Sequence, residues 1–259
     1  MINNKRKSLR LISRLEIKST NVVKGINMEG LRVVGNPEII AKQYFLDGID
    51  EIILSDVVAS LYGRNHLFEL VEKISKDIFI PIVVGGGIRS LKDIEKLLKS
   101  GADKVVINTA AVRNPELITE AAAKYGSQCI IIEIHAKFKS KNCWEVYVEN
   151  GREKTNLDLV KWMAQVEKLG AGEILIVSVD RDGTFRGLDE NLLQSINNKI
   201  SIPLIIAGGA NSSQNIIDVV NNFDIDAVSI SHALHFNKIK IKDLKDNLLS
   251  SDIETRLLS

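Results

Sequence analysis

The sequence lacks most features of secreted, membrane-spanning and nucleic-acid-binding proteins. Only two cysteines occur in 259 residues, and they form neither a disulfide framework nor a cysteine-based metal site. The formal net charge of +1 gives no overall electric field for nucleic acid or a membrane surface. No apolar run reaches the roughly 18 residues of a membrane-spanning helix, and the basic residues 1–10 contain no apolar core of a signal peptide. We therefore expect a cytoplasmic protein that binds a small charged metabolite or a protein partner.

The chain also lacks a linker rich in proline, glycine or serine, and contains instead an internal repeat. Residues 83–90 (VVGGGIRS) correspond to residues 205–212 (IIAGGANS), and residues 48–53 correspond to residues 170–175, at a spacing of roughly 122 residues. Each glycine run ends an apolar segment and precedes a helical pattern, as in loops that bind phosphate through the amides of the next helix. This self-similarity indicates a duplicated half-barrel with two phosphate sites, in one domain of residues 1–259.

Short β-branched runs alternate with amphipathic stretches, which is typical of parallel strands joined by crossover helices. Eight strands are predicted, at residues 9–17, 51–57, 80–84, 104–108, 129–135, 173–179, 204–207 and 227–231. Helices are predicted between them, for example at residues 36–46, 91–99, 115–125, 158–169 and 213–221. The predicted fold class is therefore α/β, a (β/α)8 TIM barrel built from two half-barrels.

Two of the predicted connections are unusually long, at residues 18–35 and 137–155. The second contains the alternating pattern WEVYV at residues 144–148, which predicts a hairpin. Long loops that follow strands lie on the catalytic face of such a barrel, where they often form lids.

Specific motifs occur along both halves of the chain. They are VVKG at residues 22–25, VGGGIR at 84–89, GADKV at 101–105, INTAAV at 107–112, GSQ at 126–128, GAGEIL at 170–175 and DRDGT at 180–184. They closely resemble the motifs of the HisF family, the cyclase subunits of imidazole glycerol phosphate synthase. The resemblance extends from about residue 10 to about residue 249.

The resemblance implies a barrel that receives ammonia from a HisH-like glutamine amidotransferase and needs no metal or cofactor. The ammonia crosses the barrel interior and attacks a bisphosphorylated ribulosyl substrate at the upper face. Carried over residue by residue, the substrate-binding residues are Lys24 and Asp56, with one phosphate site at Gly86, Gly87, Asn108 and Thr109 and another at Asp182, Gly183, Gly209, Ser231 and His232. Ala207 and His232 replace small hydroxyl residues usual in the family. Alternatively, the glycines serve only tight turns.

In the family, a ring of one arginine, one lysine and two glutamates gates the lower mouth of the barrel. The corresponding residues here are Arg10, Glu51, Lys104 and Glu173, each at the start of a predicted strand. Asp103 and Gln128 match positions near the docking surface for the glutaminase. The alternative is a salt-bridge cluster that only stabilises the bottom of the barrel.

The catalytic positions depart from the family pattern. The cyclase ordinarily uses two aspartates, at the ends of the first and fifth strands, as acid and base. Here these positions hold Glu16 and His135. Glu16 moves its carboxylate outward by one methylene, and a displacement of about 1 Å can cost on the order of a hundredfold in rate. His135 can exchange a proton near neutral pH but cannot serve as a permanently anionic acceptor.

Strand parity predicts a further charged group inside the barrel. Side chains alternate between the two faces of a strand, so an inward His135 implies an inward Glu133. A buried carboxylate must find a partner or become protonated. Candidate partners are His135, Ser178 and Lys104, and the alternative is a local bulge that turns Glu133 outward.

Three functions therefore compete. We favour a paralogue that keeps the conduit and the glutaminase partner, and supplies ammonia to a third protein that converts an acetamido sugar to an acetamidino sugar of a surface polysaccharide. The replaced residues are confined to the cyclase chemistry, which favours this function. The second function is a cyclase of histidine biosynthesis that uses His135 and Glu16 as acid and base. The third is a catalytically silent activator of the glutaminase, which the intact gate disfavours.

Overall fold

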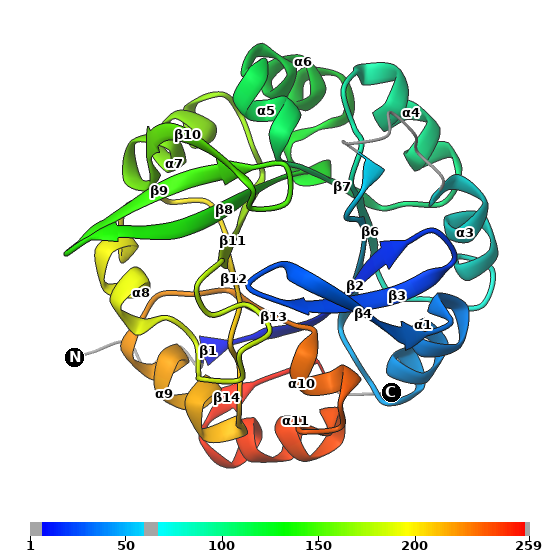
Figure 1. Cartoon of the computed structure of the whole chain (residues 1–259). Helices are drawn as coiled ribbons and strands as arrows, with labels where there is room; N and C mark the ends of the chain where they lie inside the picture. The colour runs from blue at the N-terminus through cyan, green and yellow to red at the C-terminus, as the bar shows by residue number, and fades with distance from the viewer. Residues whose placement is uncertain (1–6, 60–66, 257–259) are drawn as a thin grey trace.

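Parallel strands with apolar residues on both faces must be covered on both sides, and here they close into a barrel within a ring of helices (Figure 1). The computed structural model describes residues 7–59 and 67–256, so residues 1–6 of the basic start lie outside the described part. Eight strands pair in parallel around the barrel, and the last pairs with the first. In this order they are β2 (Arg10–Lys18), β5 (Glu51–Asp56), β6 (Ile82–Gly85), β7 (Lys104–Ile107), β8 (Ile130–Ser140), β11 (Glu173–Ser178), β12 (Leu204–Ala207) and β13 (Ala227–Ile230). The predicted (β/α)8 barrel is confirmed.

All eight predicted strands are present, and most of their ends lie within two residues of the predicted ends. The exception is β8, which continues to Ser140 instead of ending at His135. Its extension pairs in antiparallel fashion with β9 (Cys143–Val148), which in turn pairs with β10 (Glu153–Asp158). The hairpin predicted for residues 137–155 is therefore confirmed.

A second hairpin was not predicted. The connection at residues 18–35 forms β3 (Asn21–Ile26) and β4 (Glu29–Gly35), and it lies across the front of the barrel in Figure 1. Its turn places Asn27 and Met28 at φ values of 52° and 64°. Two successive positive φ values are typical of a tight hairpin turn that fits the twist of the strands.

Helices follow the strands and cover the outside of the barrel. They are α1 (Pro37–Leu46), α3 (Leu67–Ile74), α4 (Leu91–Lys99), α5 (Thr109–Arg113), α6 (Glu116–Tyr125), α7 (Leu159–Lys168), α8 (Glu190–Ile196), α9 (Ser213–Asn222), α10 (His232–His235) and α11 (Ile241–Ser250). A short 3-10 helix, η1 (Ser127–Cys129), precedes β8, and β1 (Lys7–Ser8) pairs with β14 (Ile253–Glu254). No helix among the described residues is long and apolar enough to cross a membrane.

The internal repeat is visible in how two helices begin. The side chain of Ser90 accepts a hydrogen bond from the Asp93 amide at the start of α4, and Ser212 accepts one from the Asn215 amide at the start of α9. Both serines follow a glycine loop, and each satisfies one of the free amides at a helix start. The two halves thus begin the helices after β6 and β12 with the same serine N-cap.

The middle of the barrel interior is apolar, and charged side chains lie above it. Ile12, Ile53, Val106, Ile131 and Leu175 point inward and belong to one buried cluster. On β2 the next inward positions after Ile12 are Arg14 and Glu16, because side chains alternate along a strand. Strand β8 lies four strands away from β2 in either direction around the barrel. Side chains from β2 and β8 that meet therefore meet across the interior.

Candidate functional site

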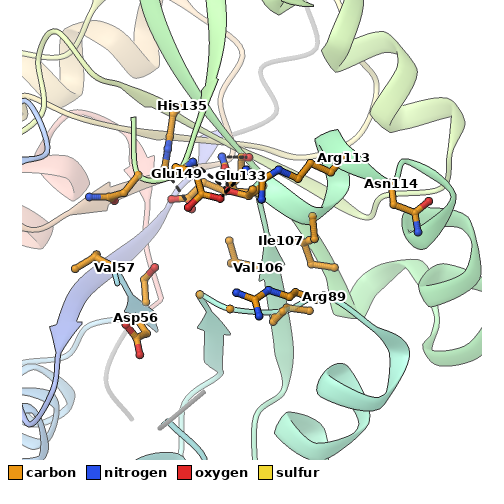
Figure 2. Close-up of a pocket in the computed structure, with 18 residues that line it drawn as sticks. Asp56, Val57, Arg89, Val106, Ile107, Arg113, Asn114, Glu133, His135 and Glu149 are labelled. Atoms are coloured by element: carbon orange, nitrogen blue, oxygen red, sulfur yellow. Dashed lines mark hydrogen bonds and ion pairs between the residues drawn. The ribbon is translucent and has the colours of Figure 1, made fainter. Parts of the chain in front are cut away.

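The larger cavity at the upper face lies beyond the carboxyl ends of β5, β6, β7 and β8. Its volume is about 260 Å³. Figure 2 shows Glu133, Glu149 and Arg113 on one side of it and Asp56 and Arg89 on the other. The predicted Asp56 and His135 line this cavity. So do all residues predicted for the first phosphate site, namely Gly86, Gly87, Asn108 and Thr109.

A second, much smaller cavity lies beyond β12 and β13. Its volume is about 20 Å³, enough for about one water molecule. All residues predicted for the second phosphate site line it, namely Asp182, Gly183, Gly209, Ser231 and His232. The ring of His232 packs 4.7 Å from the ring of Phe236 and 6.0 Å from that of Phe185, between their centroids. This packing narrows the second site, and burial followed by the charge of Lys24 lowers the pKa of His232.

The glycines of both loops have a conformational role of their own. Gly86 has a φ of 93°, and a Cβ there would lie 2.3 Å from the Asp56 carbonyl oxygen. Gly209 has a φ of 96°, and a Cβ there would lie 2.3 Å from the Gly187 carbonyl oxygen. Only glycine fits these two positions without strain. The tight turns alone therefore require these glycines, and phosphate binding has to be supported by the other residues around them.

Five charged side chains form a buried group in the upper interior, which we call the inner cluster: Arg14, Glu16, Lys24, Glu133 and Asp182. Arg14 Nη2 lies 2.8 Å from Glu133 Oε1, and Arg14 Nε lies 3.8 Å from Glu16 Oε1. Lys24 Nζ donates to Glu16 Oε1 at 2.7 Å and to Asp182 Oδ2 at 2.8 Å. Each of the five side chains is at most 7% exposed. The Arg14–Glu133 pair joins β2 to β8 and so crosses the interior of the barrel.

All three groups of the cluster with a resolved pKa shift are held in their charged forms. Burial alone would raise the pKa of Glu133, but the neighbouring Arg14, and to a smaller extent His135, lowers it to about 2. Burial would lower the pKa of Arg14 and of Lys24, yet the neighbouring carboxylates raise both. The opposite charges outweigh desolvation because each group has a partner within hydrogen-bonding or ion-pair distance.

The two predicted catalytic residues have different surroundings. His135 is 3% exposed and lines the larger cavity, and its Nε2 lies 3.4 Å from Glu133 Oε2. Neither of its ring nitrogens makes a hydrogen bond to any residue that the structure describes. Glu16 lines neither cavity and is bound to Lys24. The two residues thus do not face one common cavity. Lys24, which was expected to bind substrate, is likewise bound to Glu16 and Asp182 and lines neither cavity.

At the lower mouth, the four residues predicted to form a gate make a closed ring of ion pairs. Arg10 contacts Glu51 at 3.0 Å and also Glu173, and Lys104 contacts Glu51 at 3.3 Å and Glu173 at 2.5 Å. Burial raises the pKa of Glu51, although Lys104 and Arg10 act in the opposite direction. Positive and negative side chains therefore alternate around the ring.

The two predicted docking residues lie near this ring. Asp103, which precedes β7, is exposed, and its carboxylate accepts a hydrogen bond from the Ile82 amide at 2.8 Å. Gln128 lies in η1 and is also exposed. Both are at the amino ends of strands, on the same face as the ring.

The inward orientation of Glu133 was predicted and is confirmed, but two of its three expected partners are wrong. His135 is a partner, whereas Ser178 donates to Asp189 at 2.7 Å and Lys104 belongs to the lower ring. The main partner, Arg14, was missed. Sequence reasoning could have found it, since Arg14 precedes Glu16 by two positions on β2 and therefore shares its inward face.

Three charged residues of the larger cavity were not predicted: Arg89, Arg113 and Glu149. Arg113 lies 3.0 Å from Glu149, whose carboxylate is buried in the turn between β9 and β10. No periodic pattern marks these residues, because each lies in a loop or at a helix end that only the folded chain brings to the cavity.

Comparison with known proteins agrees with this architecture. The family model described as "Histidine biosynthesis protein" matches residues 10–240. A protein of Legionella pneumophila named imidazole glycerol phosphate synthase subunit HisF is 52% identical over 202 residues, which cover 78% of this chain and 95% of that protein. The protein of the same name from Bacillus cereus (strain G9842) is 44% identical over 248 residues, covering 96% of this chain and 98% of its own length. The chain therefore belongs to the histidine biosynthesis protein family and, within it, to the HisF group.

Proposed function

We propose that this chain is the synthase subunit of an imidazole glycerol phosphate synthase, and that it receives ammonia from a HisH-like glutaminase. The observation that carries the proposal is the pairing of an ion-pair ring at the lower mouth with a ligand cavity at the upper mouth of one barrel. The names of the relatives from Legionella pneumophila and Bacillus cereus support the same reaction. Ring, interior and cavity lie in series along the barrel axis.

In this proposal, the glutaminase docks on the lower face near Asp103 and Gln128. Ammonia enters through the ring of Arg10, Glu51, Lys104 and Glu173. A small phosphorylated metabolite occupies the upper face. One phosphate would lie against Gly86, Gly87, Asn108 and Thr109, whose backbone and side chains offer neutral hydrogen-bond donors. The other phosphate would lie at Asp182, Gly183, Gly209, Ser231 and His232, where the ring of His232 would have to move to admit it.

His135 is the proposed proton-transfer group of the reaction. It reaches the larger cavity from β8, and neither ring nitrogen is occupied by a hydrogen bond from within residues 7–59 and 67–256. A neutral imidazole accepts a proton from the ligand at one nitrogen and returns it at a later step. Glu16 contributes an anionic charge that is shared with Lys24 and lies outside the cavity lining.

An assay with the purified chain tests this function. The ribulosyl bisphosphate substrate is incubated with ammonium salt, and formation of imidazole glycerol phosphate is followed, with and without a HisH-like glutaminase and glutamine. We expect product from both nitrogen sources and loss of product in His135→Ala. Turnover that is absent with ammonium at saturating substrate, from a folded chain, would refute the cyclase assignment.

A second candidate function is the supply of ammonia for conversion of an acetamido sugar to an acetamidino sugar by a third protein, a sugar amidotransferase. The observation that favours it is the replacement of both acid–base positions, with Glu16 bound to Lys24 and His135 beside Glu133. In that case the chain, its glutaminase and the sugar-modifying protein together would consume glutamine, while the ribulosyl substrate would remain unchanged. The ring argues against a third candidate, a silent activator, because an activator needs no entrance for ammonia.

A further inference from the structure

Glu133 is a second carboxylate of the larger cavity, and the chemistry considered so far gives it no role. Its two oxygens face different partners. Oε1 lies 2.8 Å from Arg14 Nη2, and Oε2 lies 3.4 Å from His135 Nε2. Both Glu133 and His135 line the cavity, and both come from inward positions of β8. The carboxylate thus connects an arginine on the opposite strand of the barrel to the imidazole at the cavity wall. Figure 2 shows the glutamate and the imidazole of this connection.

The other charged groups of the cavity have different partners. Glu149 pairs with Arg113 at 3.0 Å, and Asp56 accepts a hydrogen bond from the Val58 amide at 3.0 Å. Arg89 donates to the Ala59 carbonyl oxygen. In the inner cluster, Glu16 and Asp182 are both bound to Lys24. Among the described residues, Glu133 is therefore the carboxylate placed to act on His135.

We propose that Glu133 is the positioning residue of His135, and that Arg14 in turn holds Glu133. The carboxylate faces Nε2 and therefore favours the neutral tautomer that carries its proton on Nε2. Nδ1 then has a free lone pair and, although it is buried in the chain without ligand, is the nitrogen left to accept a proton from the ligand. The resulting imidazolium has its positive charge beside Glu133, and the same nitrogen releases the proton to the next acceptor. A histidine and a glutamate on one strand thus replace the pair of carboxylates at the ends of two strands.

The claim that His135 transfers a proton rests on the proposed function, but the claim that its neutral ring carries the proton on Nε2 does not. The first experiment is therefore nitrogen-15 NMR of the histidine side chains, with the His135 signals assigned by comparison with His135→Gln. At a pH where the ring is neutral, we expect Nε2 to carry the proton and Nδ1 to be unprotonated. Glu133→Gln should shift the population toward a mixture of both tautomers, because a neutral amide no longer selects the nitrogen that bears hydrogen.

Glu16→Gln is the matched control, since it also removes one negative charge from the inner cluster. We expect it to leave the His135 tautomer unchanged, because Glu16 contacts Lys24 and Arg14 but not His135. The proposal is overturned if His135 carries its proton on Nδ1 in the native chain, or if the two glutamine variants affect the tautomer equally. Should Glu133→Gln fail to fold, Arg14→Met/Glu133→Leu removes the ion pair as a unit and is expected to give the same mixture.

Kinetics of the cyclase assay supply the second measurement. Glu133→Gln should lower kcat by about tenfold or more at an almost unchanged KM, since it disturbs a proton-transfer group and not the phosphate sites. Glu133→Asp, which keeps the charge, should recover part of this loss. An equal decrease in both variants would identify Glu133 as a packing residue and overturn the positioning role. If the native chain has no cyclase activity while the tautomer results hold, the proposed function fails and the positioning of His135 stands.

Discussion

The two charged groups inside this barrel are built from similar residues but differ in how far they are buried and in the ratio of cations to carboxylates. The ring at the lower mouth contains two cations and two carboxylates, and its Arg10 and Lys104 side chains are 32% and 18% exposed. The inner cluster contains two cations and three carboxylates, and none of its side chains is more than 7% exposed. Water can therefore stabilise the two cations of the ring if a partner is removed. The ring carboxylates Glu51 and Glu173, whose side chains are 2% and 10% exposed, depend like the members of the cluster on their charged neighbours.

This difference suggests different roles for the two groups. A ring that is partly hydrated can open at modest cost, which suits an entrance for a small molecule. The cluster, by contrast, fixes side chains across the barrel, from β2 to β8, and joins the hairpin strand β3 through Lys24. Rigid groups of this kind hold functional side chains in place. If burial determines these roles, substitutions in the inner cluster should mainly lower stability, and substitutions in the ring should mainly lower function.

The largest effect is expected from Arg14→Met. It leaves Glu133 and Glu16 buried with fewer cations, and breaking a buried ion pair by removing one partner costs about 3–5 kcal/mol. Urea unfolding at neutral pH measures the change. The double variant Arg14→Met/Glu133→Leu removes both members of the cross-barrel pair and should recover most of the loss. A single variant as stable as the double variant would mean that depth does not distinguish the cluster from the ring.

The next largest effect is expected on the stability of the native chain as the pH is lowered. Because the pKa of Glu133 is lowered to about 2 in the folded chain, its contribution to stability is complete above its unfolded pKa of about 4.5 and is lost as the pH falls toward 2. Its size is about 3.5 kcal/mol, since one pKa unit corresponds to about 1.4 kcal/mol. Urea unfolding of the native chain and of Arg14→Met/Glu133→Leu between about pH 7.5 and about pH 2.5 should show this loss only in the native chain.

A second group provides an internal control for that experiment. Burial, followed by the charge of Lys24, lowers the pKa of His235 to about 3, and its Nδ1 lies 2.8 Å from the Tyr44 hydroxyl. Its neutral form is favoured in the folded chain, so stability is complete above an unfolded pKa of about 6.5 and falls as the pH decreases from there toward 3. Both proteins should share this earlier loss. If it differs between them, the double substitution has altered more than the ion pair.

The features of the fold and of the site that the sequence predicts are those whose residues follow a periodic pattern, the internal repeat or a family motif. The eight strands, the ring and both loop sites follow from alternation, the internal repeat and the family motifs. Strand parity also predicted the inward Glu133, and applied to β2 it would have predicted Arg14. The β3–β4 hairpin was missed because its turn residues, Asn27 and Met28, are not a glycine-containing turn pair. Arg113 and Glu149 could not be predicted to meet, since no local rule relates a helix end to a hairpin turn 36 residues away.

The smallest effect on stability is expected at the ring, where function should change more than folding. Lys104→Ala removes one cation from contact with Glu51 and Glu173, but Arg10 still pairs with both and water reaches the ring. We expect a loss of stability below the about 3–5 kcal/mol of a fully buried pair. If the ring admits ammonia, glutamine-driven product formation should fall relative to ammonium-driven formation, while the glutaminase still hydrolyses glutamine. Lys104→Arg keeps the charge and serves as the control. Equal losses with both nitrogen sources would assign the ring to stability alone, because a weakened fold affects the upper cavity regardless of the route by which ammonia arrives.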